Sequence, residues 1–264
     1  MRVAGRIAVV TGASSGIGRA TAARLAAEGA TVVAVARREP QLQALVEELH
    51  GRSLAAEYIV ADVADREAVA SASAKVLAEH GRVDVLVNNA GIGLHRAFAD
   101  CSLDEIERCM QVNFMGAVYW MKAVLPAMTR TGSGSIVNVA SAAGAMPYTW
   151  EAVYSASKAA LIALSEATAP ELARKGIHVA WVNPGLVRTE IFTEESLRHL
   201  PAIARRSWLT PERLAAGILD VIEHERPGAS IPRTLGVTSL VRHVTPPLFR
   251  LGLRRVYESS LRRD

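Results

Sequence analysis

Short apolar runs rich in β-branched residues recur along the first 185 positions, and alanine-rich amphipathic stretches of helical length separate them. The runs show no alternation of polar and apolar positions, which is typical of strands buried on both faces of a sheet. Strands that alternate with helices predict right-handed βαβ units and a parallel sheet. The six runs are RIAVVT, TVVAVA, EYIVAD, VDVLVN, GSIVNVA and IHVAWVN. We therefore expect an α/β fold with a doubly wound parallel sheet and helices on both faces.

The pattern loosens after position 185. The stretch TPERLAAGILDVIEHE predicts a helix with Thr210 as N-cap and Pro211 at the first helical position, and ASIPR predicts a last short strand. Pro170 predicts a kink at the far end of an earlier helix. No break in composition separates two domains, so we expect one domain over residues 1–232 and an extension over residues 233–264.

Composition places the chain among globular proteins, because half of its 264 residues are hydrophobic and no apolar stretch approaches the ~18 residues that span a membrane. The N-terminus does not resemble a signal peptide. Cys101 and Cys109 are the only cysteines, and we expect both as reduced thiols in a cytoplasmic protein. The extension carries seven of the arginines against two acids, whereas the rest is nearly neutral, which argues against a nucleic-acid partner.

A glycine-rich turn, VVTGASSGIGRA, follows the first expected strand and opens the first expected helix. Glycine lets the backbone approach a pyrophosphate, and a helix N-terminus offers free N–H groups to it. An ordinary glycine turn is the alternative, but the strand before and the helix after favour dinucleotide binding. The residues expected at the cofactor here are Gly12, Ser14, Ser15, Gly16, Ile17 and Gly18.

The end of the second strand suggests which cofactor is bound. A fold selective for NAD usually carries an acidic residue here, whereas this chain has Ala36 followed by Arg37 and Arg38. Arginine pairs well with a 2′-phosphate, and a helix start is a poor place for solvated cations. We therefore expect NADP(H) in preference to NAD(H), with Arg37 as the first candidate for the phosphate and Arg38 as the second.

These features, together with five further motifs, make the chain resemble the short-chain dehydrogenase/reductase family over about residues 5–232. The segments, in order, are TGASSGIG, ADV, NNAG, QVNFMG, VASAAG, YSASK and NPGLVRT. The resemblance implies a single Rossmann-like domain that interconverts CH–OH and carbonyl groups with a nicotinamide cofactor. It also implies homodimers or homotetramers and no metal.

The resemblance assigns further cofactor contacts. Asp62 would receive the adenine amino group, with Val63 beside it. Helix N-capping is the alternative for Asp62, and turn formation is the alternative for Asn88 and Asn89. The other residues that would line the cofactor cleft are Ala90, Gly91, Pro184, Gly185, Val187 and Thr189, together with Asn88 and Asn89.

Tyr154 and Lys158 stand four residues apart and so share one helix face. A positioned tyrosine can exchange a proton with a reacting carbonyl or alcohol, and a nearby ammonium would lower its pKa. The resemblance makes Tyr154 the general acid/base and lets Lys158 bind the nicotinamide ribose. Ser141 would bond the substrate oxygen, and Asn113, in the preceding helix, would hold a relay water. The alternative for the pair is a half-buried helix with a snorkelling lysine.

The positions expected to face the substrate are mostly apolar: His95, Met146, Tyr148, Trp150, Leu186, Ile191 and Phe192. They favour a largely apolar ketone, aldehyde or secondary alcohol. A 3-oxoacyl thioester reductase is one alternative, and a non-catalytic dinucleotide-binding regulator is another.

The extension predicts a helix with Phe249, Leu253, Val256 and Tyr257 on one face and arginines off it. A basic amphipathic helix can lie on an anionic membrane, which would make the protein a peripheral membrane protein. The alternative, which the interrupting Gly252 favours, is a helix packed on its own domain or on a partner subunit.

Overall fold

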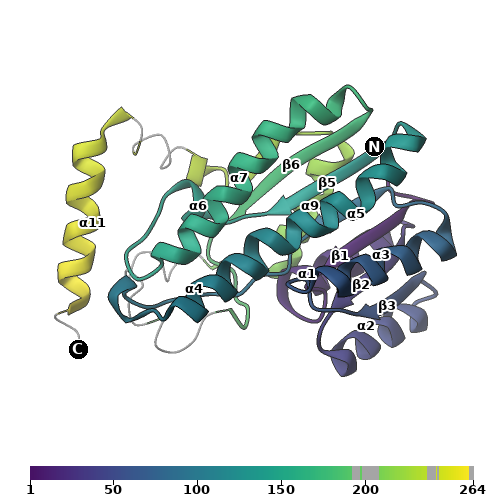
Figure 1. Ribbon diagram of the computed structural model, residues 1–264, viewed down its shortest axis with the longest axis horizontal. Helices are drawn as coiled ribbons and strands as arrows, with labels where there is room; N and C mark the ends of the chain where they lie inside the picture. The colour runs from purple at the N-terminus through teal and green to yellow at the C-terminus, as the bar shows by residue number, and fades with distance from the viewer. Residues whose placement is uncertain (192–196, 198–207, 237–241, 243, 262–264) are drawn as a thin grey trace.

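The computed structural model describes residues 1–191, 197, 208–236, 242 and 244–261. Within these residues the chain forms one sheet of seven parallel strands in the order β3-β2-β1-β4-β5-β6-β7 (Figure 1). The order reverses between β1 and β4, and such a reversal opens a crevice at the carboxyl ends of the strands. The strands are β1 Ile7–Thr11, β2 Thr31–Ala36, β3 Ala56–Val60, β4 Val85–Asn88, β5 Gly134–Val139, β6 Ile177–Pro184 and β7 Gly228–Ile231.

Helices cover both faces of this sheet. One hydrophobic cluster joins the sheet to α1, α2 and α9, and a second cluster joins its other face to α3, α5 and α7. The helices are α1 Gly16–Ala27, α2 Glu39–Gly51, α3 Arg66–His80, α4 Leu103–Met110, α5 Gly116–Thr131, α6 Ala142–Ala145, α7 Ala152–Ala173, α9 Pro211–Glu223 and α11 Pro246–Leu261, with a 3-10 turn η1 Phe98–Asp100 and a π-helical turn η2 Gln111–Met115. The doubly wound sheet and the last short strand are therefore confirmed.

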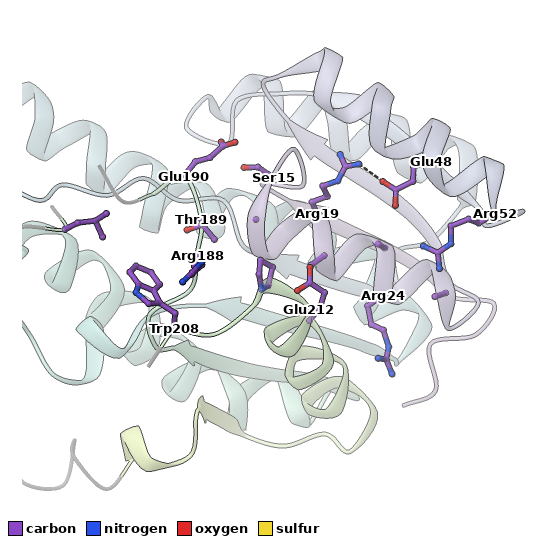
Figure 2. Close-up of a pocket in the computed structure, with 17 residues that line it drawn as sticks. Ser15, Arg19, Arg24, Glu48, Arg52, Arg188, Thr189, Glu190, Trp208 and Glu212 are labelled. Carbon is purple, nitrogen blue, oxygen red and sulfur yellow. Dashed lines mark hydrogen bonds and ion pairs between the residues drawn. The ribbon is translucent and has the colours of Figure 1, made fainter. Parts of the chain in front are cut away.

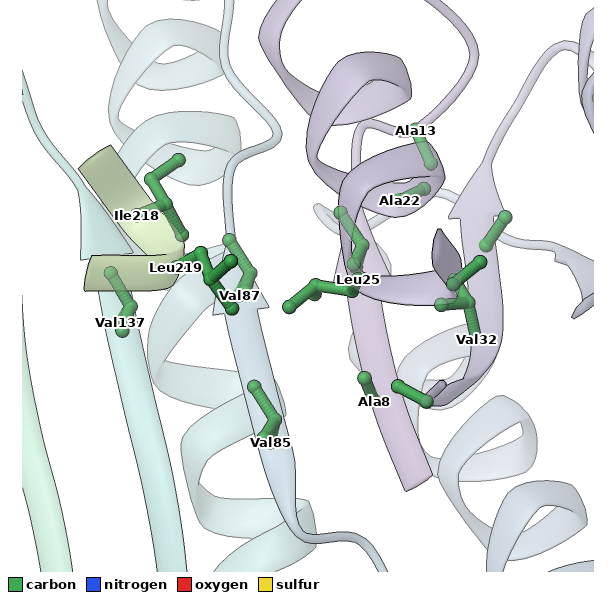
Figure 3. Close-up of a cluster of buried hydrophobic side chains, with 14 of the residues drawn as sticks. Ala8, Ala13, Ala22, Leu25, Val32, Val85, Val87, Val137, Ile218 and Leu219 are labelled. Carbon is green, nitrogen blue, oxygen red and sulfur yellow. The ribbon is translucent and has the colours of Figure 1, made fainter. Parts of the chain in front are cut away.

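The strands carry apolar residues at successive positions because both of their faces are covered. In β1, Ala8 and Val10 belong to the first cluster, whereas Val9 belongs to the second. Figure 3 shows the first cluster, in which Leu25 of α1 and Leu219 of α9 lie against the strands. Fully burying a leucine of this kind stabilises the fold by roughly 1.5–3 kcal/mol. The packed sheet is thus a rigid platform for the loops at its carboxyl edge.

Two prolines lie inside helices. Pro126 lies in α5, and α7 runs through Pro170 and ends three residues later at Ala173. Pro170 therefore lies in the last turn of α7, far along the helix from Tyr154. The kink expected at Pro170 stays a prediction.

The C-terminal extension contains α11, and Figure 1 shows this helix standing at one end of the molecule, away from the sheet. It meets the domain through Tyr257, whose ring centre lies 5.6 Å from that of Trp150. Arg242 also donates a hydrogen bond of 2.9 Å to the carbonyl oxygen of Ala145. None of the helices in the described ranges is long and apolar enough to cross a membrane.

Candidate active site

A cavity of about 760 Å³ opens at the carboxyl ends of the strands, beside the point where the strand order reverses. Segments far apart in the sequence meet there, from the glycine-rich turn to the loop after β6. Nearly all the cofactor and catalytic residues predicted from the sequence line it: Gly12, Ser14, Ser15, Gly16, Ile17, Arg37, Arg38, Asp62, Val63, Asn89, Ala90, Gly91, Ser141, Tyr154, Lys158, Pro184, Gly185, Val187 and Thr189.

A second cavity, of about 1070 Å³, lies between α1 and α9 (Figure 2). It shares Ser15, Gly16, Thr189 and Glu190 with the first cavity. An ion pair of 2.6 Å joins Arg19 to Glu48 at its edge. Ser141, Tyr154 and Lys158 are not among its described lining residues. The cavity of about 760 Å³ is therefore the candidate active site, because its lining residues are the predicted ones, even though the other cavity is larger.

The glycine-rich turn provides space and free backbone donors. Gly12 and Gly16 have φ angles of +67° and +54°, which side chains rarely adopt. Ser15 is the N-cap of α1 but makes no side-chain capping bond, and no acidic residue lies in the first turn. Among the described residues, no side chain caps the N–H groups there, which suits the phosphates of a dinucleotide.

Gly18 does not line the cavity and packs beneath the turn. A Cβ on Gly18 would overlap the carbonyl oxygen of Gly12 and the side-chain amide of Asn89. That amide donates hydrogen bonds to the carbonyl oxygens of Thr11, at 3.0 Å, and of Gly12, at 3.3 Å. Asn89 thus ties the turn to the end of β4, and Gly18 lets the two lie in contact. Asn88 points elsewhere: it is buried and donates to Asn138 at 2.9 Å, so its predicted place in the cleft is wrong.

The two arginines after β2 differ in their surroundings. The Arg38 guanidinium donates to the hydroxyl oxygens of Ser14 and Ser15, the shortest distance being 2.7 Å, and it pairs with Glu190 at 2.7 Å. The Arg37 side chain is 59% exposed and lies 3.8 Å from a carboxylate oxygen of Asp62. Arg38 is therefore held against the glycine-rich turn by several contacts, whereas Arg37 makes one longer ion pair and is more exposed to solvent.

Asp62 lies at the cavity wall with a carboxylate held by protein donors. It accepts hydrogen bonds from Ala64 N–H at 3.0 Å and from Arg108 at 2.7 Å. Burial opposes its ionisation, but these bonds outweigh burial and hold the pKa below its ordinary value. The N-cap of α3 is Asp65, so the alternative of helix capping by Asp62 is wrong.

Ser141, Tyr154 and Lys158 come together at the end of β5 and on α7. Tyr154 is 8% exposed and Lys158 is 3% exposed. The ammonium of Lys158 lies 6.0 Å from the centre of the Tyr154 ring and donates to the carbonyl oxygen of Val139 at 3.0 Å. Ser141 caps α6 by accepting a hydrogen bond from Ala143 N–H at 3.1 Å, and it also hydrogen-bonds the phenol of Tyr154.

Asn113 lies behind this group and does not line the cavity. It belongs to the π-helical turn η2, which continues directly from α4 into α5, so its predicted place in the preceding helix is confirmed. Its carboxamide donates to the carbonyl oxygen of Ile92 and to the hydroxyl oxygen of Ser157, both at 3.0 Å. Ser157 in turn donates to the carbonyl oxygen of Tyr154 at 2.7 Å. Sequence reasoning assigned Ser157 no role, yet it links Asn113 to the catalytic helix; its place between Tyr154 and Lys158 was the available signal.

Burial sets the proton affinities of the central pair. Removal from water raises the pKa of Tyr154 above its ordinary range, although the hydrogen bond with Ser141 opposes this effect. Burial also lowers the pKa of Lys158 to about 8. The expected lowering of the tyrosine pKa by the lysine does not occur in the protein alone, because desolvation of the phenol outweighs the effect of an ammonium 6.0 Å from the ring.

Replacing Lys158 by methionine should stabilise the cofactor-free protein at pH 7. A lysine pKa that falls from 10.5 to about 8 makes burial of the ammonium destabilising by about 3 kcal/mol. Between pH 8 and 10.5 the unfolded chain binds more protons than the folded one, so wild-type stability rises with pH and the advantage of Lys158→Met shrinks. Urea unfolding at pH 7 and 9.5 measures both effects, with the exposed Lys122→Met as control. A variant less stable than wild type at pH 7 would contradict this account.

Some, but not all, of the residues predicted to face the substrate line the cavity. His95, Tyr148, Trp150, Leu186 and Ile191 line it. Met146 does not line it, and Phe192 lies outside the described residues.

Sequence reasoning missed several lining residues, and three of them bear on the substrate end. Glu151 lies directly before α7, three residues ahead of Tyr154, and this spacing was a usable signal. Leu235 and Val256 come from the C-terminal extension, which no local pattern connects to the cavity.

The comparisons with known proteins agree with this fold and site. Residues 6–199 match the family model of the short chain dehydrogenases, and the chain belongs to this family. The chain is 36% identical over 234 residues to the 3-oxoacyl-[acyl-carrier-protein] reductase FabG of Thermotoga maritima, covering 85% of this chain and 93% of that protein. It is 36% identical over 190 residues to the D-threitol dehydrogenase of Mycolicibacterium smegmatis, covering 72% and 73%. A metagenomic short-chain oxidoreductase solved in complex with NADP superposes with a TM-score of 0.72 at 34% identity, covering 84% of this chain and 92% of that chain.

Proposed function

We propose that the protein transfers a hydride between NADP(H) and a carbonyl or secondary alcohol, with Tyr154 as general acid/base. The observation that carries this proposal is that Ser141, Tyr154 and Lys158 line the same cavity as the glycine-rich turn. The cofactor supplies or accepts the hydride when bound. The unpartnered N–H groups at the start of α1 and the space left by Gly12 and Gly16 would hold its phosphates.

The residues divide the remaining work between them. The raised pKa of Tyr154 keeps its phenol protonated at neutral pH, which suits donation of a proton to a developing alkoxide. Ser141 bonds the same oxygen and stabilises its negative charge. Lys158 holds the cofactor ribose and, when charged, stabilises the phenolate that remains after the proton has left. Asn113 holds α7 in position through its hydrogen bond to Ser157. Binding of a relay water by Asn113 stays a prediction.

The preference for NADP(H) rests on Arg37 and Arg38, and the NADP complex of the metagenomic relative supports it. Replacing both arginines by alanine should raise the Kd for NADPH by at least about tenfold to a hundredfold, because even one charge-assisted hydrogen bond to the 2′-phosphate contributes about 1.5–3 kcal/mol. The Kd for NADH should change little, since NADH lacks the 2′-phosphate. Fluorescence titration of both cofactors measures this, with the exposed Arg52→Ala as control. Equal losses for both cofactors would refute the assignment.

Two alternatives remain open. The Thermotoga maritima relative is a 3-oxoacyl thioester reductase, and that activity is the second candidate for this chain. A dinucleotide-binding regulator without catalysis is the third, and the assembled Ser141, Tyr154 and Lys158 argue against it. A screen of free ketones, secondary alcohols and acyl thioesters with NADPH and NADH side by side separates the three. Turnover of thioesters alone favours the second candidate, and no turnover of any substrate favours the third.

Three expectations about the whole molecule stay predictions: a homodimer or homotetramer, a cytoplasmic location, and peripheral membrane contact. The stacking of Tyr257 on Trp150 supports the alternative in which α11 packs on its own domain. Exposed Leu248 and Leu251 on α11, near three arginines, support contact with an anionic membrane.

A further inference from the structure

A histidine–glutamate pair lies in the wall of the candidate active site, beside the groups that exchange the proton in the mechanism proposed above. The Nδ1 atom of His95 lies 2.9 Å from Oε1 of Glu151, and its Nε2 atom lies 3.2 Å from the carbonyl oxygen of Ile191. Both side chains line the cavity that contains Tyr154, and they are only 8% and 14% exposed. Polar side chains this buried need their hydrogen-bonding capacity satisfied.

The contacts of His95 fix the orientation of its ring. Both atoms that face its ring nitrogens are oxygens that can only accept a hydrogen bond: a carboxylate oxygen and a backbone carbonyl oxygen. Every form of the imidazole has at least one N–H group to donate. The contact of 2.9 Å between Nδ1 and Oε1 ties the carboxylate of Glu151 to the imidazole of His95.

The pair has a defined position relative to the catalytic phenol. A Cβ on Gly93 would overlap Nε2 of His95, so the imidazole lies directly against the backbone at Gly93. Glu151 precedes Tyr154 by three residues, and its carbonyl oxygen accepts a hydrogen bond of 2.7 Å from Ser155 N–H in the first turn of α7. The ring centres of His95 and Tyr154 lie 5.9 Å apart. These contacts fix the position of the Glu151 carboxylate relative to the phenol of Tyr154.

The carboxylate of Glu151 has acceptor capacity left over. A carboxylate offers about four lone-pair sites, whereas His95 is the only described side chain that donates to this one. Trp150 and Leu186, which also line the cavity, leave a largely apolar surrounding in which an extra donor is favourable. A substrate ammonium would bring a second cationic group into the cavity that already contains Lys158. A neutral hydroxyl is the donor that fits.

We propose that Glu151, held in place by His95, binds a hydroxyl group of the substrate at a distance from the reacting carbon. The substrates are then hydroxy-ketones and the corresponding diols, and not wholly apolar ketones. This inference rests on the proposed oxidoreductase function and narrows the apolar substrate class expected from the sequence.

The test compares methyl ketones that carry a terminal hydroxyl, over a series of chain lengths, with ketones in which a methyl group replaces that hydroxyl. NADPH oxidation by the full-length protein gives kcat and KM for each pair. Wild type should prefer the best hydroxy-ketone over its partner by about tenfold or more in kcat/KM, as one hydrogen bond to a charged group allows. Glu151→Gln should bring the ratio close to one by raising KM for the hydroxy-ketone, whereas KM for the alkyl ketone should change little. Glu166→Gln, an exposed position on the same helix, is the matched control.

Each outcome bears on the proposal. Turnover of ketones without a hydroxyl preference in wild type, or a preference that survives in Glu151→Gln, overturns the inference and leaves the proposed function standing. Equal losses on both members of a pair indicate a purely structural role for Glu151 and also overturn it. No turnover of any ketone or alcohol defeats the proposed function itself. If Glu151→Gln does not fold, Glu151→Asp serves instead: it keeps the charge, withdraws the carboxylate by one methylene, and should shift the preference towards longer hydroxy-ketones.

Discussion

Tyr154→Phe should lower kcat for NADPH-dependent ketone reduction by about a thousandfold, within the range that a general acid contributes. Phenylalanine keeps the buried ring but removes the proton donor and its hydrogen bond with Ser141. The dissociation constant of NADPH should stay close to that of wild type, because the hydroxyl group supports chemistry more than cofactor binding. Steady-state kinetics on the best ketone, with fluorescence titration of NADPH, measures both quantities.

Tyr148→Phe is the matched control for this experiment. Tyr148 lines the same cavity, and burial raises its pKa to about 12. Unlike Tyr154, it lies before α7 and is not hydrogen-bonded to Ser141 within the described ranges. Its loss should change kcat little. Retention of activity in Tyr154→Phe, or an equal loss in both variants, would rule out Tyr154 as the specific proton donor.

Gly18→Ala should disrupt both stability and cofactor binding, although it adds a single methyl group. The new Cβ would overlap the carbonyl oxygen of Gly12 and the amide of Asn89, and both are held by the hydrogen bonds that join the turn to β4. Overpacking of this kind lowers the free energy of unfolding by about 3 kcal/mol. Displacement of the turn also weakens its bonds to the phosphates, so the Kd for NADPH should rise about a hundredfold.

The control for this variant is Gly51→Ala, at the last residue of α2. A Cβ there meets nothing within 4 Å, so the variant should be as stable as wild type or slightly more stable. Thermal unfolding and NADPH titration compare the two. A Gly18→Ala protein that binds NADPH with wild-type affinity would show that the turn adapts to a side chain, and our account of Gly18 would be wrong.

Features that depend on neighbours in the chain could be predicted from the sequence. The spacing of Tyr154 and Lys158 places both on one face of any helix, and the glycine-rich turn lies between a strand and a helix whatever surrounds it. The order of apolar runs was enough for the doubly wound sheet. The helix around Asn113 was predicted too, whereas the π-helical turn within it was not, because five residues are too few for periodicity to reveal a change of helix type.

The direction of the tyrosine pKa shows a second limit. Sequence reasoning counted the ammonium of Lys158 as the dominant influence on Tyr154, since opposite charges near a titrating group are visible in the chain. Burial is a property of the assembled fold, and here it acts on both groups at once: it raises the pKa of the phenol and lowers that of the ammonium. Because burial lowers the pKa of Lys158, it also makes the charged ammonium less favourable, and the expected lowering of the tyrosine pKa depended on that ammonium.

The sequence by itself determined the family, the parallel sheet and the group of residues at its carboxyl edge, because these follow from periodicity and from spacing within single elements. Tertiary structure alone decided what the cavity wall contains. It brought His95 to Glu151 across 56 positions of the chain and placed Val256 of α11 at the same cavity. Contacts of this kind arise when separate elements pack against one another, and no local pattern records which elements will meet.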